Sequence, residues 1–190
     1  MSNNKNNRKS KKKNDYKKWV IVIVLWTLVI STLISLLANV VLQAVNLFLA
    51  LIILVFIIFI GIIFDLIGVA VTAASETPFH SMASRKVKGA KEAVKLVRNA
   101  DKVSNFCNDV IGDICGVISG AIGALILVKV VLWTQLTGEN VNIIIGSIIG
   151  AIIASLTVGG KAIGKSIAIS KSNKIVFAVA KVINLMKRDR

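Results

Sequence analysis

The stretch FDLIGVAVTAASETPFHSMASRKVKGAKEAVKL, Phe64–Leu96, changes in character about half-way along. It starts as part of a long apolar run and ends as a basic amphipathic segment, with Ser75, Glu76, Thr77 and Pro78 at the join. About 20 apolar residues in a helix span the hydrocarbon core of a bilayer. The join therefore predicts the point where a transmembrane helix leaves the membrane. The proline suits the first turn of the surface helix that follows, because N–H groups there lack intrahelical partners.

The composition is that of a membrane protein. Of 190 residues, 55% are hydrophobic, and they occur in long blocks rather than scattered as in a soluble domain. The net charge is +15, but the lysines and arginines gather outside these blocks. No aromatic residues interleave with them as a base-stacking surface would require, so we expect no nucleic-acid partner.

The apolar blocks predict about four transmembrane helices. Residues 19 to about 71 contain one charge, Asp65, and are too many for a single span. Three amide side chains in the middle of this stretch predict a turn: Asn39, Gln43 and Asn46. The four expected spans are Trp19–Ala38, Asn46–Thr72, Val110–Leu132 and Ile143–Gly160.

The basic residues predict the topology. The first 18 residues carry eight Lys and Arg, residues 85–102 carry seven, and the chain from Lys161 onward carries eight. The two intervening loops carry none. Basic loops stay in the cytosol, so we expect a multi-pass protein of the cell membrane with both termini cytosolic. Residues 1–18, almost devoid of apolar side chains, are expected to be a disordered cytosolic tail.

Two further segments are predicted to be helices at the cytosolic surface. In residues 85–102, apolar side chains share one helical face and basic ones another, which predicts a basic amphipathic hairpin. The C-terminal segment repeats the pattern, with Ile175, Val179, Val182 and Met186 opposite Lys174 and Lys181. Such helices lie on anionic lipid, which we expect as a partner. The alternative is an ordinary soluble hairpin.

Small residues recur every four positions in the last two spans. The third span has Gly112, Gly116, Gly120 and Ala124, and the fourth has Gly146, Gly150 and Ala154. These stripes let helix backbones approach closely, either within the chain or across a dimer.

Four ionisable residues are predicted at the cytosolic ends of the spans: Glu76, Asp109, Asp113 and Lys161. Two interpretations remain open. They are wetted by headgroup water while Lys161 reaches the interface, or they converge on a polar cavity that suits a hard cation such as Mg²⁺. An enzyme is not expected, because His80 is the only histidine and no catalytic set or phosphate loop can be assembled.

Several motifs in order resemble a transporter family. ASETPF, the basic hairpin and NADK at Asn99–Lys102 are followed by Ile111, Gly112 and Asp113, and by GKAIGKSIA at Gly160–Ala168. Together they resemble the S-E-T-A, N-P-D-R, I-G-N and G-E-x-x-P-K-[TS]-x-A motifs of the CNNM/CorC (CorB) divalent-cation transporters. The resemblance covers roughly residues 65–186.

The resemblance implies a membrane domain over residues 45–190, usually a homodimer, with a magnesium or cobalt site near the cytosolic side. Residues 19–44 would then be an additional N-terminal transmembrane helix, and the paired CBS domains of many members would be absent. Together with the polar residues above, it makes Ser75, Glu76, Asp109 and Asp113 the candidate cation site.

One exchange separates two functional hypotheses. The family's glutamate is Lys161 here, its asparagine is Asp113, and its proline is Gly164. Divalent-cation transport is the first hypothesis. The second is a non-transporting membrane scaffold or partner-binding protein, in which an Asp113–Lys161 ion pair replaces the metal.

Overall fold

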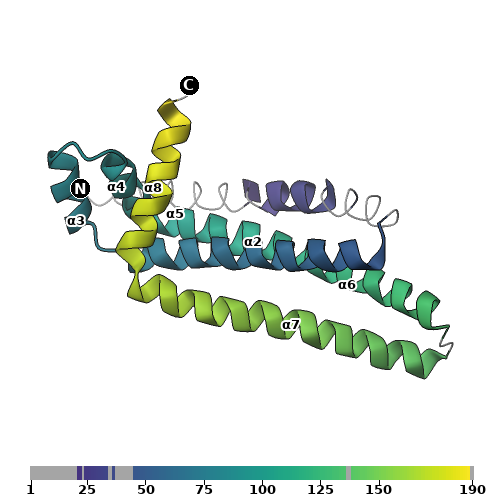
Figure 1. Ribbon diagram of the computed structural model, residues 1–190. Coiled ribbons are helices and arrows are strands. Elements are labelled where there is room, and N and C mark those ends of the chain that lie inside the picture. Colours follow the sequence, from purple (N-terminus) through teal and green to yellow (C-terminus); the bar gives the residue numbers. More distant parts are fainter. Residues whose placement is uncertain (1–20, 23, 34–35, 37–44, 136–137, 189–190) are drawn as a thin grey trace, which may run out of the picture.

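The structure is a computed structural model that describes residues 21–22, 24–33, 36, 45–135 and 138–188 (Figure 1). All elements in these ranges are helices, as the sequence predicts. They are α2 (Leu47–Ala73), α3 (Thr77–Ser84), α4 (Ala90–Arg98), α5 (Ala100–Asn105), the π-helix η1 (Phe106–Ile111), α6 (Gly112–Thr134), α7 (Glu139–Ser170) and α8 (Ser172–Arg188). The predicted tail, residues 1–18, and the turn expected at Asn39 and Gln43 lie outside the described residues.

Three helices in the described residues are long and apolar enough to cross a membrane. They are α2, the continuous helix Ala100–Thr134 formed by α5, η1 and α6, and α7. The predicted first span, Trp19–Ala38, is described mainly over the short apolar helix Val24–Leu33. The structure thus supports the membrane class, while a fourth span and the orientation of the termini stay predictions.

The second predicted span begins and ends almost where expected. The Oδ1 atom of Asn46 accepts a hydrogen bond from the backbone N–H of Leu49 at 2.9 Å, which caps α2. At the other end Ala74 is extended and α3 starts at Thr77 with Pro78 in its first turn, as predicted. Apart from the buried Asp65, α2 is apolar around most of its circumference, and large side chains such as Phe48 and Phe56 are more than half exposed. A helix of this kind is suited to lipid contact.

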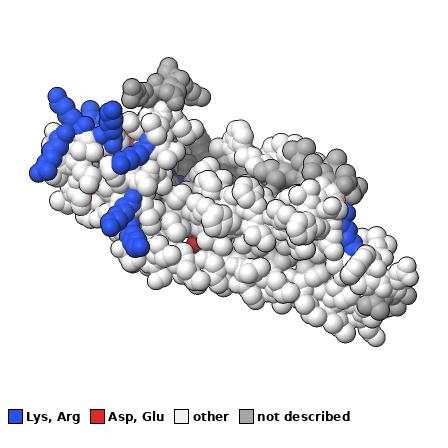
Figure 2. All heavy atoms as spheres, viewed as in Figure 1, with Lys and Arg blue, Asp and Glu red and all other residues white. Residues whose placement is uncertain are grey.

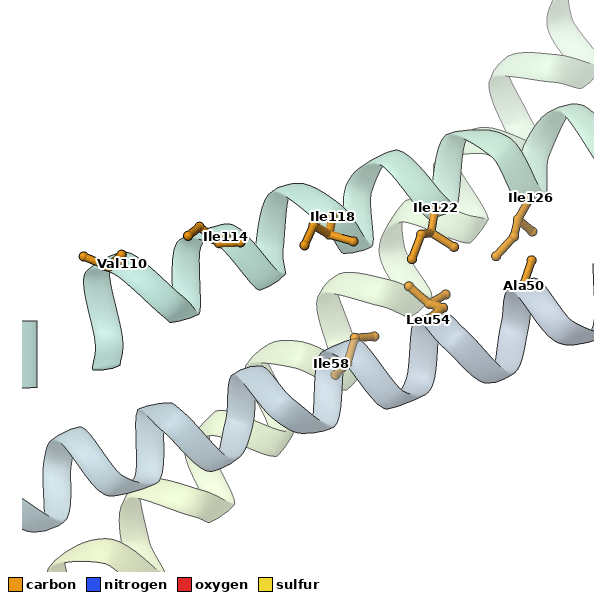
Figure 3. Packing of buried hydrophobic residues seen from close by; sticks show 8 residues of the cluster. All are labelled: Ala50, Leu54, Ile58, Val110, Ile114, Ile118, Ile122 and Ile126. Atoms are coloured by element: carbon orange, nitrogen blue, oxygen red, sulfur yellow. The ribbon is translucent and has the colours of Figure 1, made fainter. Parts of the chain in front are cut away.

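The buried face of α2 packs against α6. Isoleucines of α6, spaced four apart, point toward Ala50, Leu54 and Ile58 of α2 (Figure 3). The same face of η1 and α6 contributes Val110, Ile114, Ile118, Ile122 and Ile126. This spacing keeps one face of each helix toward the other over several turns, so α2 and α6 form the centre of the bundle.

Two predicted boundaries are wrong. The third span was expected from Val110 but its helix starts at Ala100, since α5 and η1 run into α6 without a break. The fourth span was expected at Ile143–Gly160 but α7 extends over Glu139–Ser170. In both cases polar residues continue the helix, because polar side chains are tolerated wherever a helix projects beyond the hydrocarbon core.

The remaining helices, α3, α4 and α8, pack with α5, the start of the long helix Ala100–Thr134, around one end of the bundle, which we call the basic end. Here α8 crosses the ends of the long helices rather than running beside them (Figure 1). A second core joins the end of α2 to α3, α4, α7 and α8, and its fully buried members include Phe79, Val71 and Val176. In the view of Figure 2, most Lys and Arg atoms gather over this end.

Gly89 fixes the turn between α3 and α4. Its φ of 87° favours glycine, and a Cβ there would lie 3.2 Å from the backbone of Lys181 on α8. The predicted hairpin is therefore helical, but its apolar side, with Ala90, Ala93 and Val94 buried, packs on protein. The lysines Lys88, Lys91 and Lys95 remain exposed.

Candidate functional site

The most unusual group within the bundle is Asp65 of α2. The residue is 5% exposed and lies inside a helix long enough to span a membrane. Lys161 Nζ lies 3.9 Å from Asp65 Oδ1, and Lys165 Nζ lies 4.0 Å from Asp65 Oδ2. Both lysines come from one face of α7, since they are four residues apart. One carboxylate thus faces two basic side chains, so their formal charges do not cancel.

Asn108 places an amide beside Gly68, which lies one turn after Asp65 on α2. It stands in the π-helix η1 and occupies the space left by Gly68, where an added Cβ would lie 2.1 Å from Asn108 Oδ1. Its Nδ2 donates a hydrogen bond to Ser104 Oγ at 3.2 Å. Among the described residues, Asp65 Oδ2 and Asn108 Oδ1 are the buried side-chain atoms without a hydrogen-bond partner. We call Asp65, Asn108, Lys161 and Lys165 the polar cluster.

Glu76 lies outside this cluster, at the start of α3. Its Oε1 atom accepts a hydrogen bond from Arg98 Nε at 2.5 Å and is 2.7 Å from His80 Nε2. These contacts, that of Arg98 first, lower the pKa of the Glu76 carboxyl. The neighbouring Ser75 donates its backbone N–H to Asn173 Oδ1 of α8 at 3.0 Å. Both residues join helices of the basic end to one another.

Asp109 and Asp113 lie in a different place again. Both are exposed, and with Val110 they line a groove of about 460 Å³ against the N-terminal helical segment. Its other lining residues are Val24, Thr27, Leu28, Ser31 and Thr32. The two aspartates share one face, as their spacing predicts, but that face is turned toward residues 24–32 rather than toward α7.

The predicted pair of Asp113 with Lys161 is therefore corrected. Lys161 lies beside Asp65, because α2 packs against both α6 and α7 and presents its buried carboxylate to α7. Among the residues described here, no three His, Cys, Asp or Glu side chains come together as a metal site would require. Glu76 contacts Arg98 and His80 at the basic end, whereas Asp109 and Asp113 line the groove beside residues 24–32, so a Mg²⁺ site made of these residues and Ser75 stays a prediction.

Sequence analysis missed Asp65 and Lys165 as site residues. Asp65 had the clearest signal available, because it is the one charge in the apolar stretch of residues 19–71. A charge in a membrane helix is costly and is therefore a functional candidate by default. Lys165 could have been found from its spacing of four from Lys161.

The small-residue stripes of α6 and α7 line a groove instead of a tight helix contact. The groove has a volume of about 510 Å³. A Cβ added at Gly116, Gly120 or Gly150 would meet no atom within 4 Å, whereas Gly123 and Gly146 lie against Ile153 and Leu127. Of the glycines in the two predicted stripes, Gly146 lies against the facing helix, and the contact on α6 is made by Gly123, which is outside its stripe. Gly116, Gly120 and Gly150 face the open, apolar groove.

Comparison of the chain with protein-family models, with curated proteins and with solved structures found no match. The resemblance to the CNNM/CorC transporters stays a prediction that rests on the motifs alone.

Proposed function

We propose that this chain is a non-transporting integral membrane protein whose basic end binds the anionic cytosolic surface of the cell membrane. The observation that carries the proposal is the arrangement at Asp65, where two ammonium groups lie within 4.0 Å of one buried carboxylate. A dication at this carboxylate would be repelled by both lysines. The lysines thus take the role that a metal ion would have in a transporter.

The basic end supplies the second part of the proposal. Exposed lysines of the α3–α4 connection and of α4 project from a hairpin whose apolar side is covered by protein. α8 offers Val182, Leu185 and Met186, each more than half exposed, next to exposed Lys181. Exposed apolar and basic side chains on a helix that crosses the ends of the spans suit the headgroup region. Cytosolic termini, as predicted from the charges, would turn this end toward the anionic leaflet.

A second candidate, divalent-cation transport of the CNNM/CorC type, is favoured by one observation. Two buried oxygens, Asp65 Oδ2 and Asn108 Oδ1, have no hydrogen-bond partner and are of the kind that bind hard cations. Transport through them would require both lysines to move away from Asp65.

Thermal unfolding in detergent with and without Mg²⁺ separates the two candidates. A ligand that binds only the folded chain stabilises it by about 2.7 kcal/mol at 100 times its Kd. We expect millimolar Mg²⁺ to leave the midpoint of the unmodified chain unchanged. As a control, Lys161→Glu with Lys165→Gln removes both ammonium groups and adds a carboxylate, so this variant is expected to gain Mg²⁺-dependent stability. Stabilisation of the unmodified chain would favour transport.

The surface contact has its own test in nanodiscs. Protease cleavage in residues 85–89 is expected to be slower in discs of phosphatidylglycerol than of phosphatidylcholine. Changing Lys88, Lys91 and Lys95 to Gln should remove this difference, since each lysine contributes about 1 kcal/mol near an anionic surface. Equal cleavage of the unmodified chain in both lipids would refute the contact.

A further inference from the structure

The apolar groove between α6 and α7 leads to the polar cluster. On α7 the groove is lined by Ala154 and Val158, and Lys161 and Lys165 follow at spacings of three and four. Positions spaced in this way share one helical face. On α6 the groove is lined by Gly116, one turn beyond Gly112, where an added Cβ would lie 3.6 Å from Lys161 Nζ. The apolar groove thus continues into a positively charged region.

The charge at this end of the groove is only partly neutralised. Asp65 offsets one of the two lysines, and the side chain of Lys165 remains 53% exposed. The separations of 3.9 and 4.0 Å are longer than a charge-assisted hydrogen bond, so neither ammonium group has used its donors on Asp65. An anion with several acceptor oxygens matches this surplus, whereas a cation does not.

The position of Lys165 along α7 suits a lipid headgroup. The helix has 32 residues, or about 48 Å, against about 30 Å of hydrocarbon core. Lys165 stands five residues before the end of α7 at Ser170, about 8 Å along the axis. If the helix projects equally on both sides, Lys165 reaches the level of the phosphates while the groove lies within the core.

We infer that this groove binds one anionic phospholipid of the leaflet at the basic end. The phosphate accepts hydrogen bonds from Lys161 and Lys165, and an acyl chain lies along the small residues of α6 and α7. Asp65 of α2 holds both lysines of α7 in position. The small residues of the groove are needed because larger side chains at these positions would fill the space that the acyl chain occupies. The inference rests on the proposed orientation of the basic end and adds a defined lipid site to a general surface contact.

Native mass spectrometry of the chain released from nanodiscs tests the inference. The discs contain equal amounts of phosphatidylglycerol and phosphatidylcholine. We expect one phosphatidylglycerol to stay bound to the unmodified chain. Lys165→Gln should weaken this binding about fivefold, as expected for the loss of one lysine near an anionic lipid. Lys171→Gln with Lys174→Gln, two exposed lysines of the same end, removes more charge and should have little effect.

The acyl part of the site has a matched pair of variants on α7. Gly150→Leu and Gly159→Leu both add a side chain where a Cβ would meet no atom within 4 Å, but only Gly150 lines the groove. Gly150→Leu should reduce retention of phosphatidylglycerol, and Gly159→Leu should not. Millimolar inorganic phosphate should not displace the lipid, because it has no acyl chain.

Three results would each overturn the lipid site. The first is equal retention of phosphatidylglycerol and phosphatidylcholine by the unmodified chain. The second is an equal loss of bound phosphatidylglycerol in Lys165→Gln and in the control with Lys171→Gln and Lys174→Gln. The third is full retention of phosphatidylglycerol in Gly150→Leu. Displacement by inorganic phosphate would assign the lysines to a free phosphate instead. The proposed function would fail by other measurements, namely stabilisation of the unmodified chain by Mg²⁺ or protease cleavage at the same rate in both lipids. Failure of the lipid site and failure of the proposed function can therefore be distinguished.

Discussion

Lys161 Nζ lies 3.9 Å from Asp65 Oδ1, so the lysine of α7 faces a carboxylate of α2 and not Asp113 of α6. The side chain of Asp65 is 7% exposed and that of Lys161 is 27% exposed. A charge removed from water in this way must be compensated locally. The relationship makes the contact of α2 with α7 electrostatic as well as apolar, and it predicts which charges the fold depends on.

Removing both lysines should destabilise the chain through Asp65. Lys161→Met with Lys165→Met leaves a buried carboxylate without a counter-charge, which costs about 3–5 kcal/mol. Adding Asp65→Asn to this variant should restore most of the loss. Unfolding in detergent, followed by circular dichroism, measures both effects. Asp113→Asn is the control and should change stability by less than about 0.5 kcal/mol, because Asp113 is exposed. A large effect at Asp113 would restore the pair predicted from the sequence.

Gly68 should not tolerate a methyl group. An alanine Cβ there would collide with the amide of Asn108, so the Asn108 side chain would have to leave its position and its hydrogen bond to Ser104. Overpacking of this kind costs about 1–3 kcal/mol. Gly116→Ala on α6 is the matched control, since its Cβ would meet no atom within 4 Å. Asn108→Ser should rescue Gly68→Ala by shortening the opposing side chain. Thermal midpoints that are the same for both alanine variants would disprove the contact.

The contact between α3 and α4 should weaken in acid. Arg98, and then His80, lower the pKa of Glu76, so their contact with the carboxylate stabilises the folded hairpin at neutral pH. That stability is lost as the pH falls through the lowered pKa of Glu76, when the carboxyl takes up a proton. Hydrogen exchange in Thr77–Arg98 should therefore become faster in acid relative to α2. Glu76→Gln should show the faster exchange already at neutral pH, while Glu92→Gln should behave as the unmodified chain.

Cysteine labelling should place the basic end inside the cell. In a chain with Cys107 and Cys115 changed to Ser, Gly138→Cys should react with an impermeant maleimide on intact cells. Lys91→Cys should react only after the membrane is opened, because basic segments stay in the cytosol. Lys91 is used because it is exposed, whereas Gly89 is buried against α8. Labelling of Lys91→Cys on intact cells would reverse the topology.

Local patterns in the sequence determined the class of fold and most helices. Length and apolarity predicted α2 as a possible span, Asn46 predicted its start, and Pro78 predicted the beginning of α3. These features succeed because spanning length, capping and proline geometry depend on a few neighbouring residues. Helix ends without such signals were placed wrongly, as at Ala100 and at Ser170, because polar residues do not stop a helix that leaves the membrane.

Only the tertiary structure decided which charges meet. Spacing showed that Asp109 and Asp113 share a face of one helix, and that Lys161 and Lys165 share a face of another. Spacing within a helix says nothing about its rotation relative to the next helix, which depends on packing across the whole interface. In the bundle α2 lies against both α6 and α7, so Asp65 receives the two lysines, and the aspartates of the π-helix and α6 face residues 24–32 instead.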